Sequence, residues 1–152
     1  MVVDDDRTNP TANRSGYRAV ARSRITMLEQ TVSSVTANSL KKGDVLGTAR
    51  FAGVQAAKNA ASLLPISTSL LVRSTTIEFD LGHDTIDVEA VVDCLDAHAV
   101  EMPAFSAATA AVLTIYDMCK SADHTMIIGP VELVERSGDP SSEWLRTDVS
   151  GE

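Results

Sequence analysis

Aromatic and basic residues are scarce in this chain of 152 residues. Phe, Tyr and Trp together make up 4% of it, and 13 Lys and Arg stand against 21 Asp and Glu, so the formal net charge is −8. Proteins that bind nucleic acid or an anionic membrane need a basic surface, and the composition therefore argues against both partners. An acidic chain still has room for a local group of lysines that binds a small phosphorylated ligand.

Cysteines and long apolar runs are also few. Cys94 and Cys119 cannot supply a disulfide framework or a zinc site, which favours a reducing, cytoplasmic compartment. The first residues are acidic and lack the apolar segment of a signal peptide. No membrane span is expected either, because the most apolar stretch is interrupted by four polar residues, Asp44, Arg50, Gln55 and Lys58.

The length and an apolar fraction of 44% predict one domain with a single core. Residues 1–16 are polar and predict a flexible N-terminal arm, and residues 137–152 predict a polar C-terminal tail. The predicted domain is the segment between them, residues 17–136.

Hydrophobic periodicity predicts the order strand, helix, strand, strand, helix, strand. The predicted elements are strand 23–27, a short helix 28–37, helix 43–64 ended by Pro65, a hairpin of strands 72–81 and 85–94, helix 104–121 and strand 126–135. Pro130 places the last strand at an edge or a bulge. This order is typical of an α+β, ferredoxin-like split βαβ fold with an antiparallel sheet and helices on one face. The other sheet face is then free to meet a partner chain.

Two short motifs carry groups suited to chemistry. Lys41 and Lys42 directly precede the helix expected from Gly43, and lysines beside free helix N–H groups favour a phosphate. The alternative for these lysines is a solvated surface pair. Asp117 and Lys120 are three residues apart on a helix, which suits either an acid–base pair or a routine surface ion pair.

A third motif, Glu101-Met102-Pro103, stands between a strand end and a helix start. Glu101 has either a binding role or a simple capping role near the helix N-terminus. His98 comes three residues before Glu101 and could reach the same site. The three histidines lack the spacing of metal ligands, and neither a Gly-rich phosphate loop nor a nucleophile elbow is present.

Taken together, a series of segments closely resembles the cyclic pyranopterin monophosphate synthases of molybdenum cofactor biosynthesis, over roughly residues 19–137. The segments are Lys42-Gly43-Asp44-Val45, Thr48-Ala49-Arg50, Ala52-Gly53-Val54-Gln55-Ala56-Ala57-Lys58, Leu64-Pro65, Val100-Glu101-Met102, Leu113-Thr114-Ile115-Tyr116-Asp117-Met118-Cys119-Lys120 and Ile128-Gly129-Pro130-Val131.

The resemblance implies a ferredoxin-like α+β fold, assembled as a homohexamer built from three dimers with the active site at a subunit interface. It implies a lyase that converts 3′,8-cyclo-7,8-dihydro-GTP, or a related cyclised purine nucleotide, to a cyclic-phosphate pterin with release of pyrophosphate. The family requires no redox cofactor, so no cofactor and no metal are expected. The implied partners are the small nucleotide substrate and further copies of the chain.

The resemblance also implies roles for individual residues. Lys42 and Lys120 match the two essential lysines of the family, and Asp117 matches its active-site aspartate. The lysines are expected to hold the triphosphate or, with a lowered pKa, to move a proton, while Asp117 orients Lys120. The implied substrate-binding positions are Arg50, Ser67, Thr68, His98, Glu101, Met102 and Pro103.

Several positions depart from the family pattern. Thr68 stands where the family has a histidine, Ala97 where it has a lysine, Pro103 where it has a second glutamate, and Tyr17 where an arginine is expected. Loss of such polar groups lowers the rate with the original substrate. Three interpretations therefore stay open: the usual reaction, a related substrate in specialised metabolism, or nucleotide binding without turnover.

Overall fold

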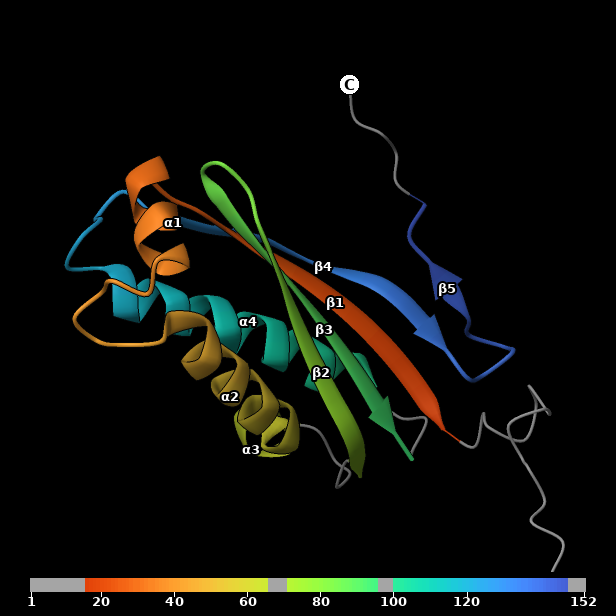
Figure 1. The fold of residues 1–152 in the computed structure, drawn as a ribbon. Coiled ribbons are helices and arrows are strands. Elements are labelled where there is room, and N and C mark those ends of the chain that lie inside the picture. The colour runs from red at the N-terminus through yellow and green to blue at the C-terminus, as the bar shows by residue number, and fades with distance from the viewer. Residues whose placement is uncertain (1–15, 66–70, 96–99, 148–152) are drawn as a thin grey trace, which may run out of the picture.

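The computed structural model describes residues 16–65, 71–95 and 100–147 (Figure 1). Its elements are, in order, β1 (Tyr17–Thr26), α1 (Glu29–Thr36), α2 (Val45–Lys58), α3 (Ala60–Leu63), β2 (Val72–Leu81), β3 (Thr85–Cys94), α4 (Glu101–Cys119), β4 (Ile127–Ser137) and β5 (Trp144–Leu145). The predicted roles that fall on Ser67, Thr68, Ala97 and His98 lie outside the described residues.

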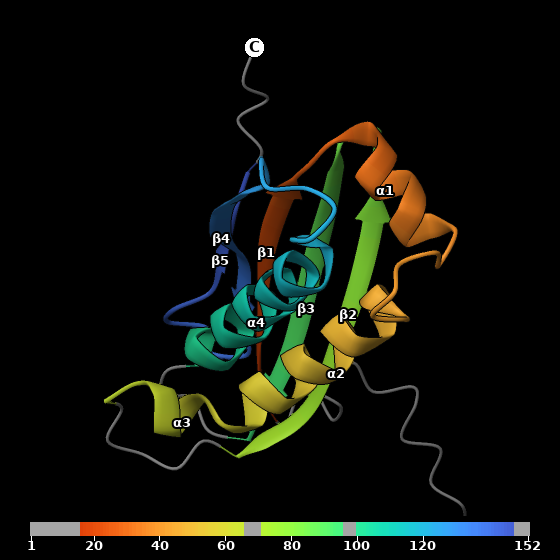
Figure 2. The same ribbon diagram turned by 90° about the vertical axis from the view of Figure 1, so that its left-hand side faces the viewer.

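The strands form one antiparallel sheet in the order β2-β3-β1-β4-β5. The first strand of the chain therefore lies between β3 and β4, as the split βαβ pattern requires, and the predicted ferredoxin-like α+β fold is confirmed. Figure 2 shows α1, α2 and α4 on the same side of the sheet. The opposite side, called the open face below, carries the side chains of Arg18, Arg22 and Arg24 from β1.

The core lies between the sheet and the helices and follows the alternation of the sequence. Every second residue of β3 is fully buried, namely Ile86, Val88, Ala90, Val92 and Cys94. Small residues let the helices approach: a Cβ at Gly53 of α2 would lie 3.0 Å from the carbonyl oxygen of Ala107 in α4 and would clash with Ile77 of β2. Gly53 therefore lets α2 pack close to both the sheet and α4.

Three elements differ most from their predicted boundaries. β1 begins at Tyr17, six residues before the predicted strand, because its arginines point to the open face while Ala19 and Ala21 are buried. The predicted helix 43–64 is divided at Asn59, whose ψ of 12° leaves the helical range and separates α2 from α3. α4 begins at Glu101 because Pro103 fits the first helical turn.

Pro130 lies at an irregularity of β4, as predicted. The register between β1 and β4 shifts between Ser23 and Ile25, opposite Val131 and Ile128, and the Gly129–Pro130 peptide is cis. The C-terminal segment contains a feature that the sequence did not predict: β5 pairs with β4 through Leu145 and Trp144. The local sequence around this two-residue strand is rich in turn residues, which concealed it.

Within the described ranges, α4 alone is long and apolar enough to cross a membrane by length and composition. The expectation that no stretch reaches this limit is therefore wrong for α4. Half of its apolar window is buried in the protein, and its alanine-rich face packs against the sheet and α2. The apolar character of α4 thus matches its place in the core.

Candidate active site

Lys42, Asp117 and Lys120 come together at the C-terminal end of α4, and we call them the lysine cluster. The Nζ atom of Lys42 donates to the carbonyl oxygen of Asp117 at 3.0 Å, although the two residues are 75 positions apart. The same Nζ atom lies 4.0 Å from Oδ2 of Asp117. Lys120 Nζ donates to Oδ1 of Asp117 at 2.7 Å. The structure therefore unites the three predicted catalytic residues.

The local sequence before α2 explains how Lys42 reaches this place. Gly43 has a φ of +95°, a left-handed conformation that favours glycine, and it turns the chain into the helix. Asp44 then caps α2 by accepting a hydrogen bond from the backbone N–H of Gly47 at 3.0 Å. A Cβ at Gly47 would clash with the Asp44 carboxylate. Gly43 and Gly47 thus build the turn and the cap that present Lys42.

Charge pairing sets the protonation of the lysine cluster. The hydrogen bond from Lys120, together with the charges of Lys120 and Lys42, lowers the pKa of Asp117. The hydrogen bond to Asp117 and its charge raise the pKa of Lys120. Both groups are therefore charged at neutral pH. A lowered lysine pKa was one expectation, and for Lys120 in this chain the direction is the opposite.

The lysine cluster is open to solvent. The side chains of Lys42, Asp117 and Lys120 are 45%, 62% and 51% exposed. Two ammonium groups against one carboxylate leave a local positive charge on an acidic protein, and the cations lie at the C-terminal end of a helix, where the dipole favours them. Such a surface can bind a phosphorylated ligand and can donate protons to it.

Arg50, a predicted binding residue, contacts the sheet. Its Nε atom donates to the backbone oxygen of Ile77 at 3.2 Å, and its guanidinium carbon lies 5.2 Å from the centre of the Phe79 ring. Both contacts join α2 to β2. The described structure therefore gives Arg50 a packing role and does not bring it into the lysine cluster.

The other predicted binding residues lie at the opposite end of α4. Glu101 forms an ion pair with Arg136 of β4, and both side chains are largely buried. Met102 is half-buried, and Pro103 is fully buried and offers no polar group. Because a helix rises about 1.5 Å per residue, Glu101 and Asp117 are separated by about 24 Å along the axis. One chain therefore does not bring Glu101 to the lysine cluster.

Sequence reasoning missed two residues that hold these groups. Arg136 meets Glu101 across 35 positions, and no local spacing predicts such a pair. Asp123 is buried beside the end of α4 and accepts hydrogen bonds from both the backbone N–H and the hydroxyl of Thr125. The sequence Asp-x-Thr after a helix is a recognisable turn motif, so Asp123 could have been found.

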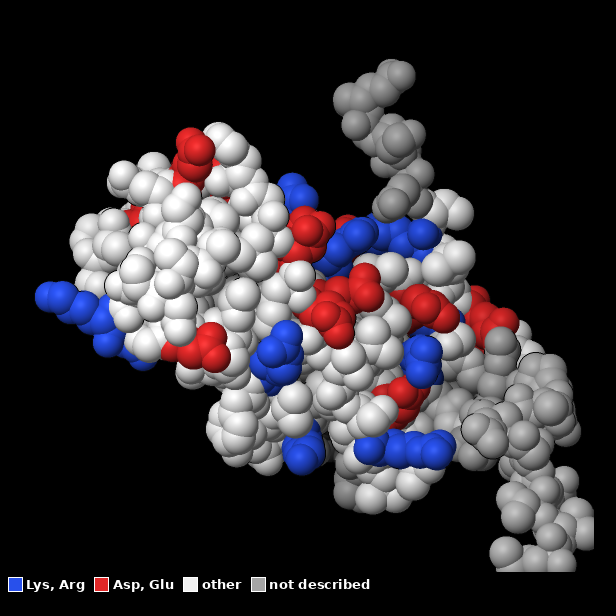
Figure 3. All heavy atoms as spheres, viewed as in Figure 1, with Lys and Arg blue, Asp and Glu red and all other residues white. Residues whose placement is uncertain are grey.

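The open face carries a ladder of ion pairs. Arg18 pairs with Asp93 at 2.8 Å, Arg24 with Asp87 at 2.6 Å, and Arg22 with Glu132 at 3.1 Å. In Figure 3, groups of opposite charge accordingly alternate over this side of the molecule. On this face each of the three arginines of β1 is therefore paired with a carboxylate of a neighbouring strand.

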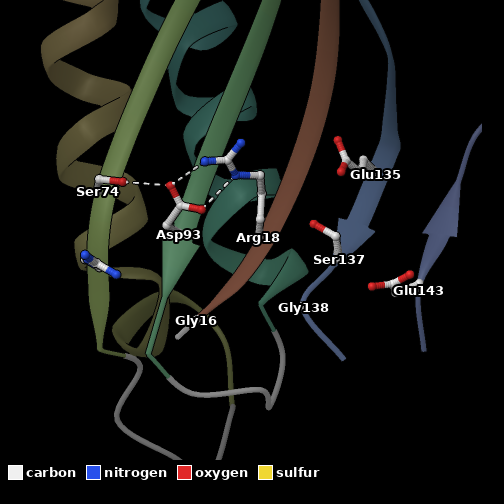
Figure 4. A pocket seen from close by; sticks show the side chains of 9 residues that line it. Gly16, Arg18, Ser74, Asp93, Glu135, Ser137, Gly138 and Glu143 are labelled. Atoms are coloured by element: carbon white, nitrogen blue, oxygen red, sulfur yellow. Dashed lines mark hydrogen bonds and ion pairs between the residues drawn. The ribbon is translucent and has the colours of Figure 1, made fainter. Parts of the chain in front are cut away.

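A groove of about 590 Å³ crosses the open face near the start of β1. Figure 4 shows Arg18 and Ser74 directed at Asp93 on one side, and Glu135 and Glu143 on the other. Burial alone would raise the pKa of Asp93, but its hydrogen bonds to Arg18 and Ser74 lower it. Three carboxylates against two arginines make this lining unsuited to a triphosphate, and it shares no residue with the lysine cluster.

Comparison of the sequence with known proteins identifies the family of the chain. The sequence profile of the MoaC family matches residues 9–139. The cyclic pyranopterin monophosphate synthase of Chloroflexus aurantiacus is 41% identical over 130 residues, which cover 84% of this chain and 80% of that protein. The chain belongs to the MoaC family. The synthase of Pelobacter propionicus is 37% identical over 150 residues, 97% of this chain and 91% of its own length.

MoaC-family membership confirms the resemblance seen in the sequence and places the chain in molybdenum cofactor biosynthesis as a lyase of the synthase type. A further relative, the molybdenum cofactor biosynthesis bifunctional protein of Chlorobaculum tepidum, is 42% identical over 125 residues, which are 82% of this chain and 40% of that protein. The individual residue roles remain predictions, and the lysine cluster gives them a physical basis.

Proposed function

We propose that this chain converts 3′,8-cyclo-7,8-dihydro-GTP to cyclic pyranopterin monophosphate and releases pyrophosphate. The observation that supports the proposal is the convergence of Lys42, Asp117 and Lys120 from two distant segments of the chain. A triphosphate needs fixed cations, and the lysine cluster offers two ammonium groups to it. The relatives of this chain in Chloroflexus aurantiacus and Pelobacter propionicus are named cyclic pyranopterin monophosphate synthase.

In this proposal the lysine cluster acts on the phosphates and on proton transfer. When the cyclic phosphate forms, a sugar hydroxyl loses its proton to water as its oxygen bonds to the α-phosphorus, the bond from that phosphorus to the pyrophosphate oxygen breaks, and negative charge develops on the leaving group. Lys42 and Lys120 stabilise that charge. The hydrogen bond to Asp117 raises the pKa of Lys120 and keeps Lys120 protonated. Lys120 therefore serves as a cation or a general acid, and it becomes a base only after it has given up its proton.

We further propose that the complete site forms between two copies of the chain, within a cytoplasmic homohexamer of three dimers. Glu101 is a hydrogen-bond acceptor suited to the N–H groups of a guanine-derived ring. A small nucleotide cannot contact both ends of an α4 that is 19 residues long. A second copy would bring its own Glu101 to the first copy's lysine cluster, and the charged open face or the helices would supply the contact.

A second candidate function is turnover of a related cyclised nucleotide in another pathway. It is favoured by Pro103, which is buried where the family has a second glutamate and so gives the site no carboxylate at that position. Thr68 and Ala97, in place of the family's histidine and lysine, point in the same direction. The lysine cluster would keep its role with phosphates, while the recognition of the ring would change.

The deciding experiment incubates the purified protein with 3′,8-cyclo-7,8-dihydro-GTP and measures both cyclic pyranopterin monophosphate and pyrophosphate. We expect both products in equal amounts, and neither with the Lys120→Ala variant. A folded oligomer that yields neither product would overturn the first proposal and favour the second. A test of cyclised nucleotides that differ in the base would then follow.

A further inference from the structure

Asp123 is a buried carboxylate for which the proposed reaction has no direct use. It is 2% exposed and accepts hydrogen bonds from the backbone N–H of Leu28 at 2.9 Å, from the hydroxyl of Thr31 at 3.0 Å, and from the backbone N–H and hydroxyl of Thr125 at 2.8 and 2.7 Å. Each carboxylate oxygen thus has two donors. A buried group satisfied in this way is held rigidly in one position.

The donors belong to the two segments that carry the lysine cluster. Leu28 and Thr31 form the start of α1, and the chain continues from α1 to Lys42. Asp123 itself follows Lys120 by three residues, and its backbone N–H donates to the carbonyl oxygen of Cys119 at 3.1 Å, which extends the end of α4. One carboxylate therefore binds the α1 segment to the C-terminal end of α4.

The Asp123 carboxylate lies at the N-terminal end of α1, where α1 has no side-chain cap of its own. Leu28 occupies the N-cap position of α1 and has no side chain that could accept a hydrogen bond from the first turn. The Asp123 carboxylate accepts from the backbone N–H of Leu28 and the hydroxyl of Thr31, not from a backbone N–H of the first turn, and its negative charge is favoured at a helix N-terminus. Burial alone would raise its pKa, but the hydrogen bonds from Leu28, Thr125 and Thr31 lower the pKa to about 2. Asp123 is therefore an anion at neutral pH.

We propose that Asp123 is a positioning residue for the lysine cluster: by joining the start of α1 to the turn after Lys120, it fixes the distance from Lys42 to Asp117 and the orientation of Lys120. The role in turnover rests on the proposed function, whereas the effect on the Lys120–Asp117 pair does not. Displacing catalytic groups by about 1 Å can lower a rate by about a hundredfold, so a positioning residue has a measurable effect.

The test uses substitutions that remove donors or acceptors and keep the shape. In Asp123→Asn, the amide oxygen keeps two acceptor sites while the NH2 group faces two donors. Thr31→Val removes only the hydroxyl that joins α1, and Thr31→Ser restores it. Ser23→Ala is the matched control, because Ser23 is fully buried and its hydroxyl donates to the carbonyl oxygen of Ala108 at 2.9 Å, in the middle of α4.

Two quantities are measured on the intact oligomer, at a temperature at which every variant is folded by circular dichroism. We expect kcat to fall by about tenfold to a hundredfold in Asp123→Asn and less in Thr31→Val, with recovery in Thr31→Ser and no change in Ser23→Ala. We also expect the titration of Lys120, followed by NMR of its Nζ or Cε atom, to move to lower pH in Asp123→Asn. The reason is that a loosened pair with Asp117 raises the pKa of Lys120 less.

The two readouts separate the proposals. If the wild-type protein does not turn over 3′,8-cyclo-7,8-dihydro-GTP, the proposed function fails, and the Lys120 titration alone decides the positioning role. If Asp123→Asn and Thr31→Val are destabilised like Ser23→Ala but leave both kcat and the Lys120 titration at wild-type values, Asp123 has only a structural role. That result would overturn the inference.

Discussion

The two ends of α4 are built in different ways. At the C-terminal end, Lys42, Asp117 and Lys120 are exposed and carry an excess of positive charge, and the buried Asp123 lies in the turn that follows Lys120. At the N-terminal end, the Glu101 carboxylate is largely buried and already neutralised by Arg136. The C-terminal end can therefore attract an anion from solution. At the N-terminal end, Glu101 is already paired with Arg136, and only the lone pairs of its carboxylate that Arg136 does not use can accept further hydrogen bonds.

The largest expected effect comes from breaking the exposed end. Lys42→Ala and Lys120→Ala each remove an ammonium group from the lysine cluster, and we expect turnover to fall at least about a thousandfold, because the developing charge on pyrophosphate loses its partner. The oligomer should persist, since both side chains are about half exposed. Turnover by product assay and size by sedimentation check the two statements.

Lys41→Ala is the matched control for this prediction, because Lys41 is exposed, adjacent to Lys42 and carries the same charge. We expect Lys41→Ala to keep most of the turnover. Any loss of activity should be seen only at low salt, where the long-range attraction of the lost charge for the substrate is not screened. If Lys41→Ala lost as much activity as Lys42→Ala, general positive charge rather than the contact with Asp117 would carry the effect.

A smaller effect is expected when variants of the two ends are mixed. Glu101→Ala and Lys120→Ala should each be inactive or weakly active alone. In a two-fold dimer each site would combine one end from each copy, so random mixing restores about a quarter of the wild-type activity. The measurement is turnover after the two variants are unfolded together, refolded and purified as one oligomer.

The mixing experiment also has an outcome that contradicts it. Activity that stays at the average of the two separate variants would show that both groups serve a site within one chain or that Glu101 has no part in the site. Co-refolding of Lys42→Ala with Lys120→Ala is the control, because both changes affect the same end and no restored site is expected.

The sequence predicted those parts of the fold that depend on strict alternation. The hairpin strands 72–81 and 85–94 agree with β2 and β3, because one side of each strand is apolar and the other polar. β1 was predicted too short, since Arg18 and Arg22 look unlike a strand until their partners Asp93 and Glu132 on the open face are known. The break at Asn59 within the predicted helix 43–64 likewise has no periodic signal.

The candidate site was predictable to a different degree at its two ends. The Asp117–Lys120 pair follows from helical spacing alone, while the approach of Lys42 across 75 positions was expected only from the family resemblance. The Glu101–Arg136 pair joins a helix start to a distant strand, so neither spacing nor composition could indicate it. Contacts of this kind depend on the tertiary fold, and a single sequence does not encode them in any local pattern.

The smallest effect concerns stability in acid and again separates the two ends of α4. The folded state holds the pKa of Asp123 at about 2, below the ordinary aspartate value of 3.8. A lowered pKa stabilises the folded state fully above pH 4 and loses this contribution as the pH falls through 2, and we expect a contribution of about 2 kcal/mol. Urea unfolding between pH 6 and pH 2 measures it.

The contribution of the ionised Asp123 carboxylate is isolated by comparing the free energy of unfolding of the wild type with that of Asp123→Asn at each pH. The difference between the two should shrink by about 2 kcal/mol from pH 6 to pH 2, because the protonated aspartic acid gains no more than the amide from its donors. Ser23→Ala, which removes a hydrogen bond to the middle of α4 without a titrating group, should differ from the wild type by the same amount at every pH. A constant difference for Asp123→Asn as well would mean that its charge does not stabilise the turn after Lys120, and the support of the exposed end would then rest on packing alone.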